Sequence, residues 1–166
     1  MRAELALDVK EQAEHRMLLD LARNDIGRVA EFGSVRVTAR EVVEEYSHVF
    51  HLVSEVEGRL DPAHGVADAV AALFPGGTIT GAPKIRAMEV IAELEPVARG
   101  AYTGGLGWIG PGGAQLNILI RSAVCRDGQV GIHAGAGIVW DSDPGREWRE
   151  SRRKAAALRA ALGVEE

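Results

Sequence analysis

Apolar residues recur at helical spacing in four parts of the chain. Residues 2–23 carry an apolar residue at every fourth position without an internal Gly or Pro, which predicts a helix that ends near Asn24. Shorter amphipathic patterns predict helices over residues 62–74 and 83–95, and each of these opens on a proline, which suits a first helical turn. A last helix is predicted over about 144–162.

Period-two alternation of apolar and polar residues predicts strands between these helices. Residues 26–37 are hairpin-like around a Phe-Gly pair, and residues 47–58 have the β-branched alternation of a strand. Three further strands are predicted over 102–110, 115–125 and 130–140, joined by the turn-forming stretches PGG and RDGQ. An antiparallel meander is the simplest arrangement of these three.

The order helix, strands, two helices, strands, helix predicts an α+β fold with antiparallel sheet layers flanked by helices. We find no internal repeat, low-complexity tract or linker in the sequence. A chain of 166 residues is long enough for one domain with a core, so we expect a single compact unit.

Composition and charge limit the kinds of partner and the compartment that we expect for the chain. The formal net charge of −5 argues against a dedicated nucleic-acid binder, which would need a basic face. No apolar run approaches the length of roughly 20 residues that spans a bilayer, so we expect no membrane partner. The single cysteine, Cys125, rules out an internal disulfide, favours a reducing compartment, and is interpreted as a structural thiol at the end of a buried strand. These features predict a cytoplasmic protein.

Two pairs of carboxylates stand three residues apart, each on a predicted helix. Glu11 and Glu14 form the first pair, and Glu147 and Glu150 form the second, with Lys154 one turn further on. Each pair alone is typical of a solvated helix face. If the two helices faced one cleft, one oxygen from each would suit Mg²⁺, and a remaining glutamate could donate a proton.

Three other features have both a structural and a functional interpretation. His51 alternates in phase with apolar neighbours along the predicted strand. It is either a hydrogen-bonded core histidine or a polar group in the wall of an active site. The glycine-rich stretch GGTITGAPK lacks the Walker spacing and is either a tight connection or an anion-binding loop. Arg121 lies within an apolar stretch. Either it stands at an exposed end of the strand, or its guanidinium is paired with a carboxylate.

Taken together, these segments resemble the C-terminal part of the chorismate-utilising enzymes, anthranilate synthase component I and aminodeoxychorismate synthase component I. The matching stretches run in family order over nearly the whole chain: KEQAEHRMLLDLARNDIGRV, YSHVFHLVSEVEG, LFPGGTITGAPKIRAMEVIAELEP, YTGGLGWIG, LNILIRS, HAGAGIVWDSDP and EWRESRRKA. The resemblance implies the C-terminal portion of the anthranilate synthase-like, chorismate-binding fold over residues 1–166.

The resemblance also implies roles for individual residues. Glu14 and Glu150 match the ligands of Mg²⁺, which holds the ring carboxylate of chorismate, and Glu147 lies beside them. Glu11 matches the general acid that protonates the departing 4-hydroxyl, and His51 matches the histidine next to the ring. The remaining matches are positions that contact the carboxylates and enolpyruvyl group of the substrate: Thr78, Tyr102, Arg121, Gly137 and Lys154.

Two activities of the family are compatible with these motifs. Anthranilate synthase adds ammonia at C2 and eliminates pyruvate, which leads to tryptophan. Aminodeoxychorismate synthase delivers the amino group to C4, which leads to para-aminobenzoate and folate. FPGGTITGAPK, LNILIR and DSDP favour the second activity, whereas AGAG favours the first. In both, ammonia comes from a glutamine amidotransferase subunit.

The sequence also departs from the family pattern. The N-terminal half of the family domain, including the PIKGT segment with a nucleophilic lysine, is expected upstream of Met1. Ala114-Gln115 replaces the usual Met-Asp, and Arg149 replaces an acidic residue. Two hypotheses follow: a catalytic half that works with a complementing N-terminal segment, or a truncated, non-catalytic remnant that self-associates through open sheet edges.

Overall fold

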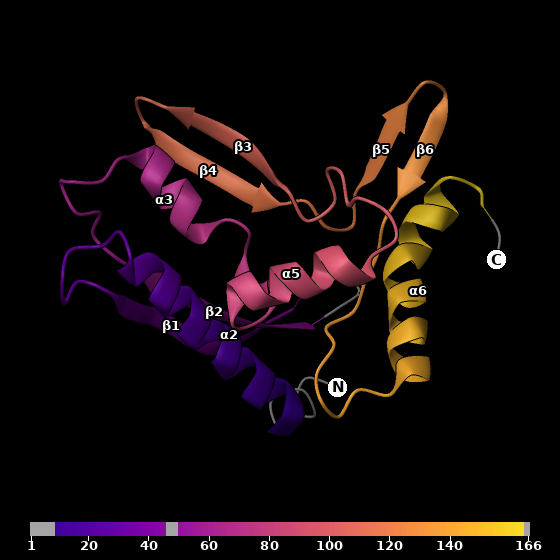
Figure 1. Ribbon diagram of the computed structural model, residues 1–166, viewed down its shortest axis with the longest axis horizontal. Coiled ribbons are helices and arrows are strands. Elements are labelled where there is room, and N and C mark those ends of the chain that lie inside the picture. Colours follow the sequence, from indigo (N-terminus) through magenta and orange to yellow (C-terminus); the bar gives the residue numbers. More distant parts are fainter. Residues whose placement is uncertain (1–8, 46–49, 165–166) are drawn as a thin grey trace. The chain divides into compact units, whose positions relative to one another are not determined.

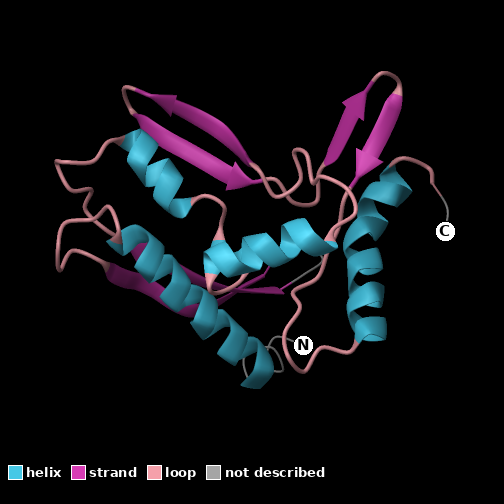
Figure 2. Cartoon of the chain, in the orientation of Figure 1, coloured by secondary structure: helices cyan, strands magenta, loops and turns pink. Residues whose placement is uncertain are grey.

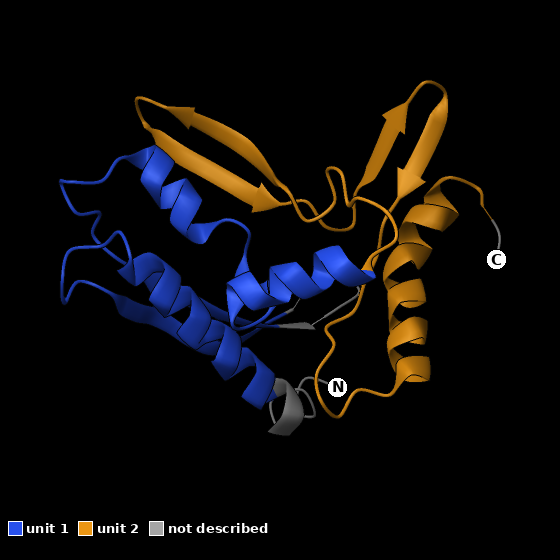
Figure 3. Ribbon diagram, in the orientation of Figure 1, with its two compact units in different colours: residues 1–94 blue, residues 95–166 orange. Residues whose placement is uncertain are grey.

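The structure, a computed structural model, describes residues 9–45 and 50–164. Its elements alternate between helices and antiparallel strand pairs in the predicted order (Figures 1 and 2), which confirms the α+β class. The contacts divide the chain into two compact units, Met1–Leu94 and Glu95–Glu166, coloured separately in Figure 3. A single partial domain over residues 1–166 stays a prediction.

The first unit begins with helix α2 (Val9–Gly27), which packs on the antiparallel pair β1 (Arg36–Glu45) and β2 (Phe50–Glu57). Across this contact, Nε2 of His15 lies 2.7 Å from Oγ of Ser54. The same hydroxyl accepts the backbone N–H of Glu41 at 2.9 Å, where the ladder shifts register and Glu41 has a φ of 52°. A side-chain oxygen thus satisfies a backbone donor that the bulge removes from the ladder.

Three helices complete the first unit: α3 (Val66–Leu73), the single turn α4 (Gly77–Thr80) and α5 (Lys84–Leu94). Among the described residues, the buried apolar side chains are Leu19 of α2 and Ala72 of α3. A Cβ at Gly77 would overlap the side chain of Leu21, so α4 approaches α2 this closely because residue 77 is glycine.

An ion pair joins α2 to α5. Nζ of Lys84 lies 2.7 Å from Oδ2 of Asp25, and the two side chains are only 13% and 10% exposed. The same ammonium donates a second, longer hydrogen bond of 3.4 Å to the carbonyl oxygen of Ala72 in α3. One lysine therefore connects α2, α3 and α5.

The second unit contains two hairpins and a helix. Strands β3 (Gly105–Gly110) and β4 (Gly113–Ile118) form one hairpin, and β5 (Ala123–Arg126) and β6 (Gln129–Ile132) form the other. The tip of the second hairpin is Asp127-Gly128, both with positive φ, as expected for an Asp-Gly turn. Helix α6 (Pro144–Ala161) starts where the carboxylate of Asp143 accepts the N–H of Arg146 at 2.8 Å.

The three-stranded meander predicted for this part is wrong. The second predicted strand, 115–125, divides into β4 and β5, because the chain turns at Arg121, which has a φ of 51°. The third predicted strand ends at Ile132, and the glycine-containing stretch after it is irregular. Two separate hairpins, each a two-stranded sheet, replace the meander.

Two expectations for the first unit are also corrected. Helix α2 continues past Asn24 to Gly27, so Asp25 lies within its last turn, where its side chain accepts a hydrogen bond from Lys84. The hairpin predicted over residues 26–37 is wrong: the strand after the turn pairs with β2, and only an isolated bridge joins Ala30 to Leu60.

Cys125 is not buried. It lies on β5, a strand whose residues are all exposed, and it is a free, exposed thiol. The prediction of a buried strand end at this position is therefore wrong, because no second layer covers the β5–β6 hairpin within its unit.

None of the helices that the structure describes combines sufficient length with sufficient apolar character to cross a bilayer.

We predict that Lys84→Met lowers the free energy of unfolding by about 3–5 kcal/mol, because it leaves the buried carboxylate of Asp25 without its cation. The measurement is equilibrium denaturation in urea. Arg86→Met is the matched control, since Arg86 is 65% exposed and pairs with an exposed Glu89. That control should cost less than about 1 kcal/mol. Equal losses for the two variants would contradict the assigned role of Lys84.

Candidate functional site

The candidate residues of the first unit lie on α2, β2 and α4. Glu14 is half-buried on α2, and Thr78 is exposed on the single turn α4, which contacts α2. Glu11 and His51 belong to α2 and β2, but their side chains lie outside what the structure describes. The roles predicted for these four residues stay predictions.

The ammonium of Lys84, the lysine of GGTITGAPK, is already paired and is not available to the anion of a ligand. Its ammonium is held by Asp25 and by the carbonyl of Ala72, in a position that is 13% exposed. The structure thus removes the ammonium of Lys84 from the groups of this stretch that could bind an anion. Whether the rest of the stretch is a tight connection or an anion-binding loop stays open. The sequence did contain an acidic residue suited to this lysine, but 59 positions separate the two.

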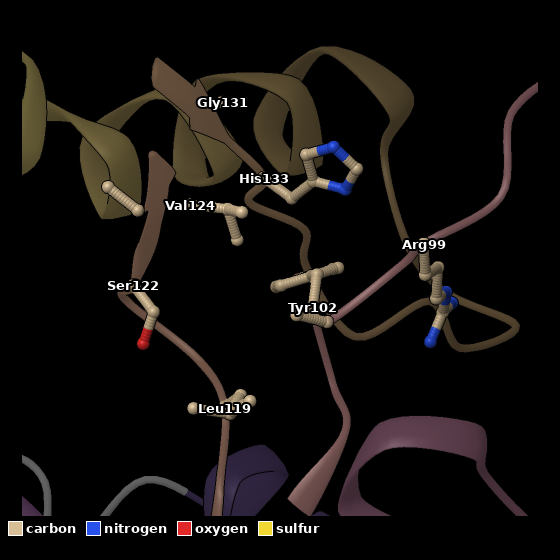
Figure 4. Close-up of a pocket in the computed structure, with 9 residues that line it drawn as sticks. Arg99, Tyr102, Leu119, Ser122, Val124, Gly131 and His133 are labelled. Carbon is tan, nitrogen blue, oxygen red and sulfur yellow. The ribbon is translucent and has the colours of Figure 1, made fainter. Parts of the chain in front are cut away.

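In the second unit, Tyr102 lines a pocket of about 270 Å³ together with Arg99 and His133 (Figure 4). The imidazole of His133 meets the Tyr102 ring edge-on, with ring centroids 5.6 Å apart and an interplanar angle of 61°. The guanidinium carbon of Arg99 lies 6.0 Å from the same ring centroid. The other lining residues are mostly small or apolar: Ala101, Leu119, Ser122, Ala123, Val124 and Gly131.

Arg99 is fixed by a two-pronged ion pair with Glu95. Its Nε donates to Oε2 at 2.8 Å and its Nη2 donates to Oε1 at 2.6 Å. The hydrogen bonds from Arg99 lower the pKa of the Glu95 carboxyl, helped by the charges of Arg99 and His133, while partial burial opposes the shift. Sequence reasoning missed Glu95, Arg99 and His133, although the spacing of Glu95 and Arg99 at i and i+4 is a recognisable helix-type pair.

Helix α6 carries three of the candidate residues on one face. Glu147 and Glu150 are half-buried, and Oε1 of Glu150 lies 2.7 Å from Nζ of Lys154, one turn further on. The structure therefore brings the predicted metal ligand and the predicted substrate-binding lysine into contact with each other. Glu14, the other predicted metal ligand, belongs to the first unit, and the pair stays a prediction.

Arg121 and Gly137 are both exposed and both lie in irregular segments, Arg121 between β4 and β5 and Gly137 after β6. Of the two interpretations of Arg121, the exposed position agrees with the structure, in which the chain turns at this residue with a φ of 51°. Its predicted contact with a substrate carboxylate stays a prediction. Neither residue lines the pocket at Tyr102.

Over the described parts of the chain, no three side chains among His, Cys, Asp and Glu gather as a metal cluster. Mg²⁺ in proteins is usually held by one or two carboxylates with water and substrate oxygens completing the shell. The half-buried carboxylates of α6 are donors of that chemical type.

Comparison with known proteins defines the family. The sequence pattern of the chorismate binding enzymes matches residues 1–160. The chain is 52% identical over 164 residues to aminodeoxychorismate synthase component 1 of Bacillus subtilis (strain 168), covering 98% of this chain and 35% of that protein. It is 53% identical over 160 residues to anthranilate synthase component 1 of Bacillus caldotenax, covering 96% of this chain and 32% of that protein.

A solved structure agrees with the sequence comparison. The crystal structure of anthranilate synthase component I from Streptococcus pneumoniae TIGR4 superposes with a TM-score of 0.89 at 47% sequence identity, covering 94% of this chain and 36% of that one. The chain therefore belongs to the chorismate binding enzyme family and has a part of its fold. It spans about a third of the length of these relatives.

We predict a pH-dependent effect for Glu95→Gln. Because the folded-state pKa of Glu95 is lowered from 4.5, the ion pair contributes stability above that value and loses it as the pH falls through the lowered pKa. Glu95→Gln should therefore reduce stability at neutral pH, by less than about 1 kcal/mol because the carboxylate is 39% exposed. The deficit should vanish near pH 2, which is about two units below the usual value.

Urea denaturation at both pH values measures this effect. Glu93→Gln, which removes the exposed carboxylate of a glutamate near the end of α5, is the control for the loss of one negative charge. A deficit of Glu95→Gln that is the same at both pH values would exclude the ion pair as its cause.

Proposed function

We propose that this chain supplies part of the active site of a Mg²⁺-dependent chorismate-aminating enzyme, most similar to aminodeoxychorismate synthase component 1. The observation that supports a chorismate-aminating enzyme is the identity of 52% to the Bacillus subtilis protein over 98% of the chain. The choice between the two activities rests on local sequence motifs. The stretches FPGGTITGAPK, LNILIR and DSDP favour aminodeoxychorismate synthase. The name component 1 implies a second component, which we take to be the glutamine amidotransferase subunit that supplies ammonia in the cytoplasm.

Anthranilate synthesis is the second candidate. The identity to the Bacillus caldotenax anthranilate synthase component 1 is 53%, so overall identity does not separate the two activities. AGAG at residues 134–137 is the local feature that favours anthranilate synthase. The two products differ in whether the enolpyruvyl group is kept or lost.

The proposed chemistry assigns one task to each group of residues. Glu11 donates the proton that the 4-hydroxyl needs in order to leave, since hydroxide is a poor leaving group. His51 lies beside the ring, and Thr78 is the candidate catalytic residue of the α4 turn. Backbone and side chains at four other positions bind the substrate: Tyr102, Arg121, Gly137 and Lys154. The exposed guanidinium of Arg121 is available for a substrate carboxylate.

Glu14 and Glu150 are the proposed ligands of Mg²⁺, with Glu147 beside them. The cation supplies positive charge that offsets the ring carboxylate of chorismate. Glu150 is paired with the ammonium of Lys154, at 2.7 Å, and both side chains are about two-fifths exposed. Such a pair is weak, about 0.3–0.5 kcal/mol, so Glu150 can exchange Lys154 for a divalent cation and leave the ammonium to a substrate anion.

A non-catalytic remnant is the alternative outside enzyme function. The observation that keeps it open is the set of apolar side chains that the β3–β4 hairpin leaves exposed, among them Leu106, Trp108 and Ile109. Such a surface suits either a complementing segment or a second copy of the chain. Self-association without Mg²⁺-dependent chorismate binding would favour this alternative.

We predict that chorismate binds the purified chain only when Mg²⁺ is present, and that Glu14→Ala and Glu150→Ala each abolish this binding. Isothermal titration of chorismate with and without Mg²⁺ measures it. Glu89→Ala, which removes an exposed helix carboxylate, is the control and should bind as the unsubstituted chain does. A folded chain that takes up no chorismate would contradict the proposed function and favour the remnant.

We predict that the chain, combined with the N-terminal portion that its longer relatives have, Mg²⁺ and ammonium, converts chorismate into an amino product that keeps the enolpyruvyl group. Mass spectrometry distinguishes this product from anthranilate, whose formation also releases pyruvate. Anthranilate and pyruvate in equal amounts would show that the second candidate is correct.

A further inference from the structure

Tyr102 is contacted by two side chains that come from different segments of the second unit. Arg99, three residues earlier, places its guanidinium carbon 6.0 Å from the ring centroid, within the range of a cation–π contact. His133, which follows β6, meets the ring edge-on at 5.6 Å. Figure 4 shows Arg99, Tyr102 and His133 around the same pocket.

The guanidinium of Arg99 is itself held by three hydrogen bonds. Glu95 accepts two hydrogen bonds from the guanidinium at 2.8 and 2.6 Å, and Oγ1 of Thr103 accepts a third at 3.4 Å. Thr103 is 9% exposed, and its backbone N–H donates to the carbonyl oxygen of Leu119 at 2.8 Å. These contacts fix the orientation of the planar guanidinium of Arg99 next to the Tyr102 ring.

The hydroxyl end of Tyr102 lies against the AGAG stretch. A Cβ built on Gly135 would lie 3.1 Å from Oη of Tyr102, closer than an ordinary van der Waals contact. The phenol oxygen therefore meets bare backbone two residues before Gly137. The hydroxyl of Thr103 donates a hydrogen bond to the backbone carbonyl of Tyr102, so this bond does not involve the Tyr102 hydroxyl.

We propose that Glu95, Arg99 and His133 are positioning residues, which fix the ring of Tyr102 so that its hydroxyl points to the backbone of the AGAG stretch. Glu95 orients Arg99, Arg99 and His133 contact the ring, and Gly135 leaves space for the oxygen. This inference rests on the proposed function in one respect, namely that Tyr102 contacts substrate. The benefit of the arrangement is a hydroxyl that is already oriented when a ligand arrives.

Nuclear magnetic resonance of ring-labelled tyrosine tests the positioning directly, without substrate. The chain contains two tyrosines, Tyr46 and Tyr102, so Tyr102→Phe assigns the signals. Glu95→Gln should shift the Tyr102 ring signals although Glu95 does not line the pocket, because it frees Arg99. Glu93→Gln is the control and should leave them in place. Unchanged Tyr102 signals in Glu95→Gln would overturn the proposal.

Two variants of His133 test its edge contact with the Tyr102 ring. His133→Ala removes the edge contact and should shift the Tyr102 signals, whereas His133→Phe keeps a ring and should shift them less. If His133→Ala unfolds, His133→Phe still decides, because an exchange of the ring beside Tyr102 should shift the Tyr102 signals slightly. Signals identical to those of the unsubstituted chain would contradict the role of His133.

The contact at Gly135 is tested by a double-mutant cycle. Gly135→Ala should destabilise the chain when residue 102 is tyrosine, and much less when it is phenylalanine, because the second substitution removes the oxygen that the new methyl group meets. Equal effects in both backgrounds would show that the hydroxyl does not lie against this backbone.

Chorismate titration separates this inference from the proposed function. If chorismate binds, Glu95→Gln should weaken binding by about tenfold, as expected when one contact is lost or misplaced, while Glu93→Gln leaves it unchanged. If the unsubstituted chain does not bind chorismate, the proposed function fails, and the signal shifts of Tyr102 alone decide whether the positioning is correct.

Discussion

The first unit depends on one buried ion pair. Asp25 near the end of α2 and Lys84 at the start of α5 lie 2.7 Å apart with little exposure to water. A charge in such a position is costly unless it is paired, so neither side chain is stable there alone. The ammonium also donates to the carbonyl of Ala72, whose side chain is one of the two buried apolar groups among the described residues. The polar contact and the small apolar core thus occupy the same place.

This pair has a consequence for ligand binding. The glycine-rich stretch that ends in Lys84 has the composition of an anion loop, yet its cation is already neutralised by Asp25. A doubly charged substrate would have to find its positive partners elsewhere. Arg121 is exposed, and Lys154 pairs with a glutamate that is 42% exposed, so a carboxylate can reach either of these two cations at low cost.

The sequence predicted the elements better than their partners. The last helix and the Asp-Gly turn were correct because their signals are local: a proline after a capping aspartate, and residues that accept positive φ. The end of α2 was wrong because Asp25 has its partner 59 residues away. The meander was wrong because nothing in an apolar stretch announces the turn at Arg121. The site motifs were recognisable as family residues, whereas His133 contacts Tyr102 only through the fold.

The hairpins of the second unit pose a different constraint. A two-stranded sheet is marginally stable alone in water, and β3–β4 exposes large side chains such as Trp108 on its surface. Covering that surface by a second copy would leave each pair with further open edges, which favours continued association over a closed dimer. A segment that adds strands to the edge and side chains to the face would pair the open strand edges and also cover the exposed apolar side chains. A complementing segment is therefore the occupant that the geometry of the hairpin favours over self-association.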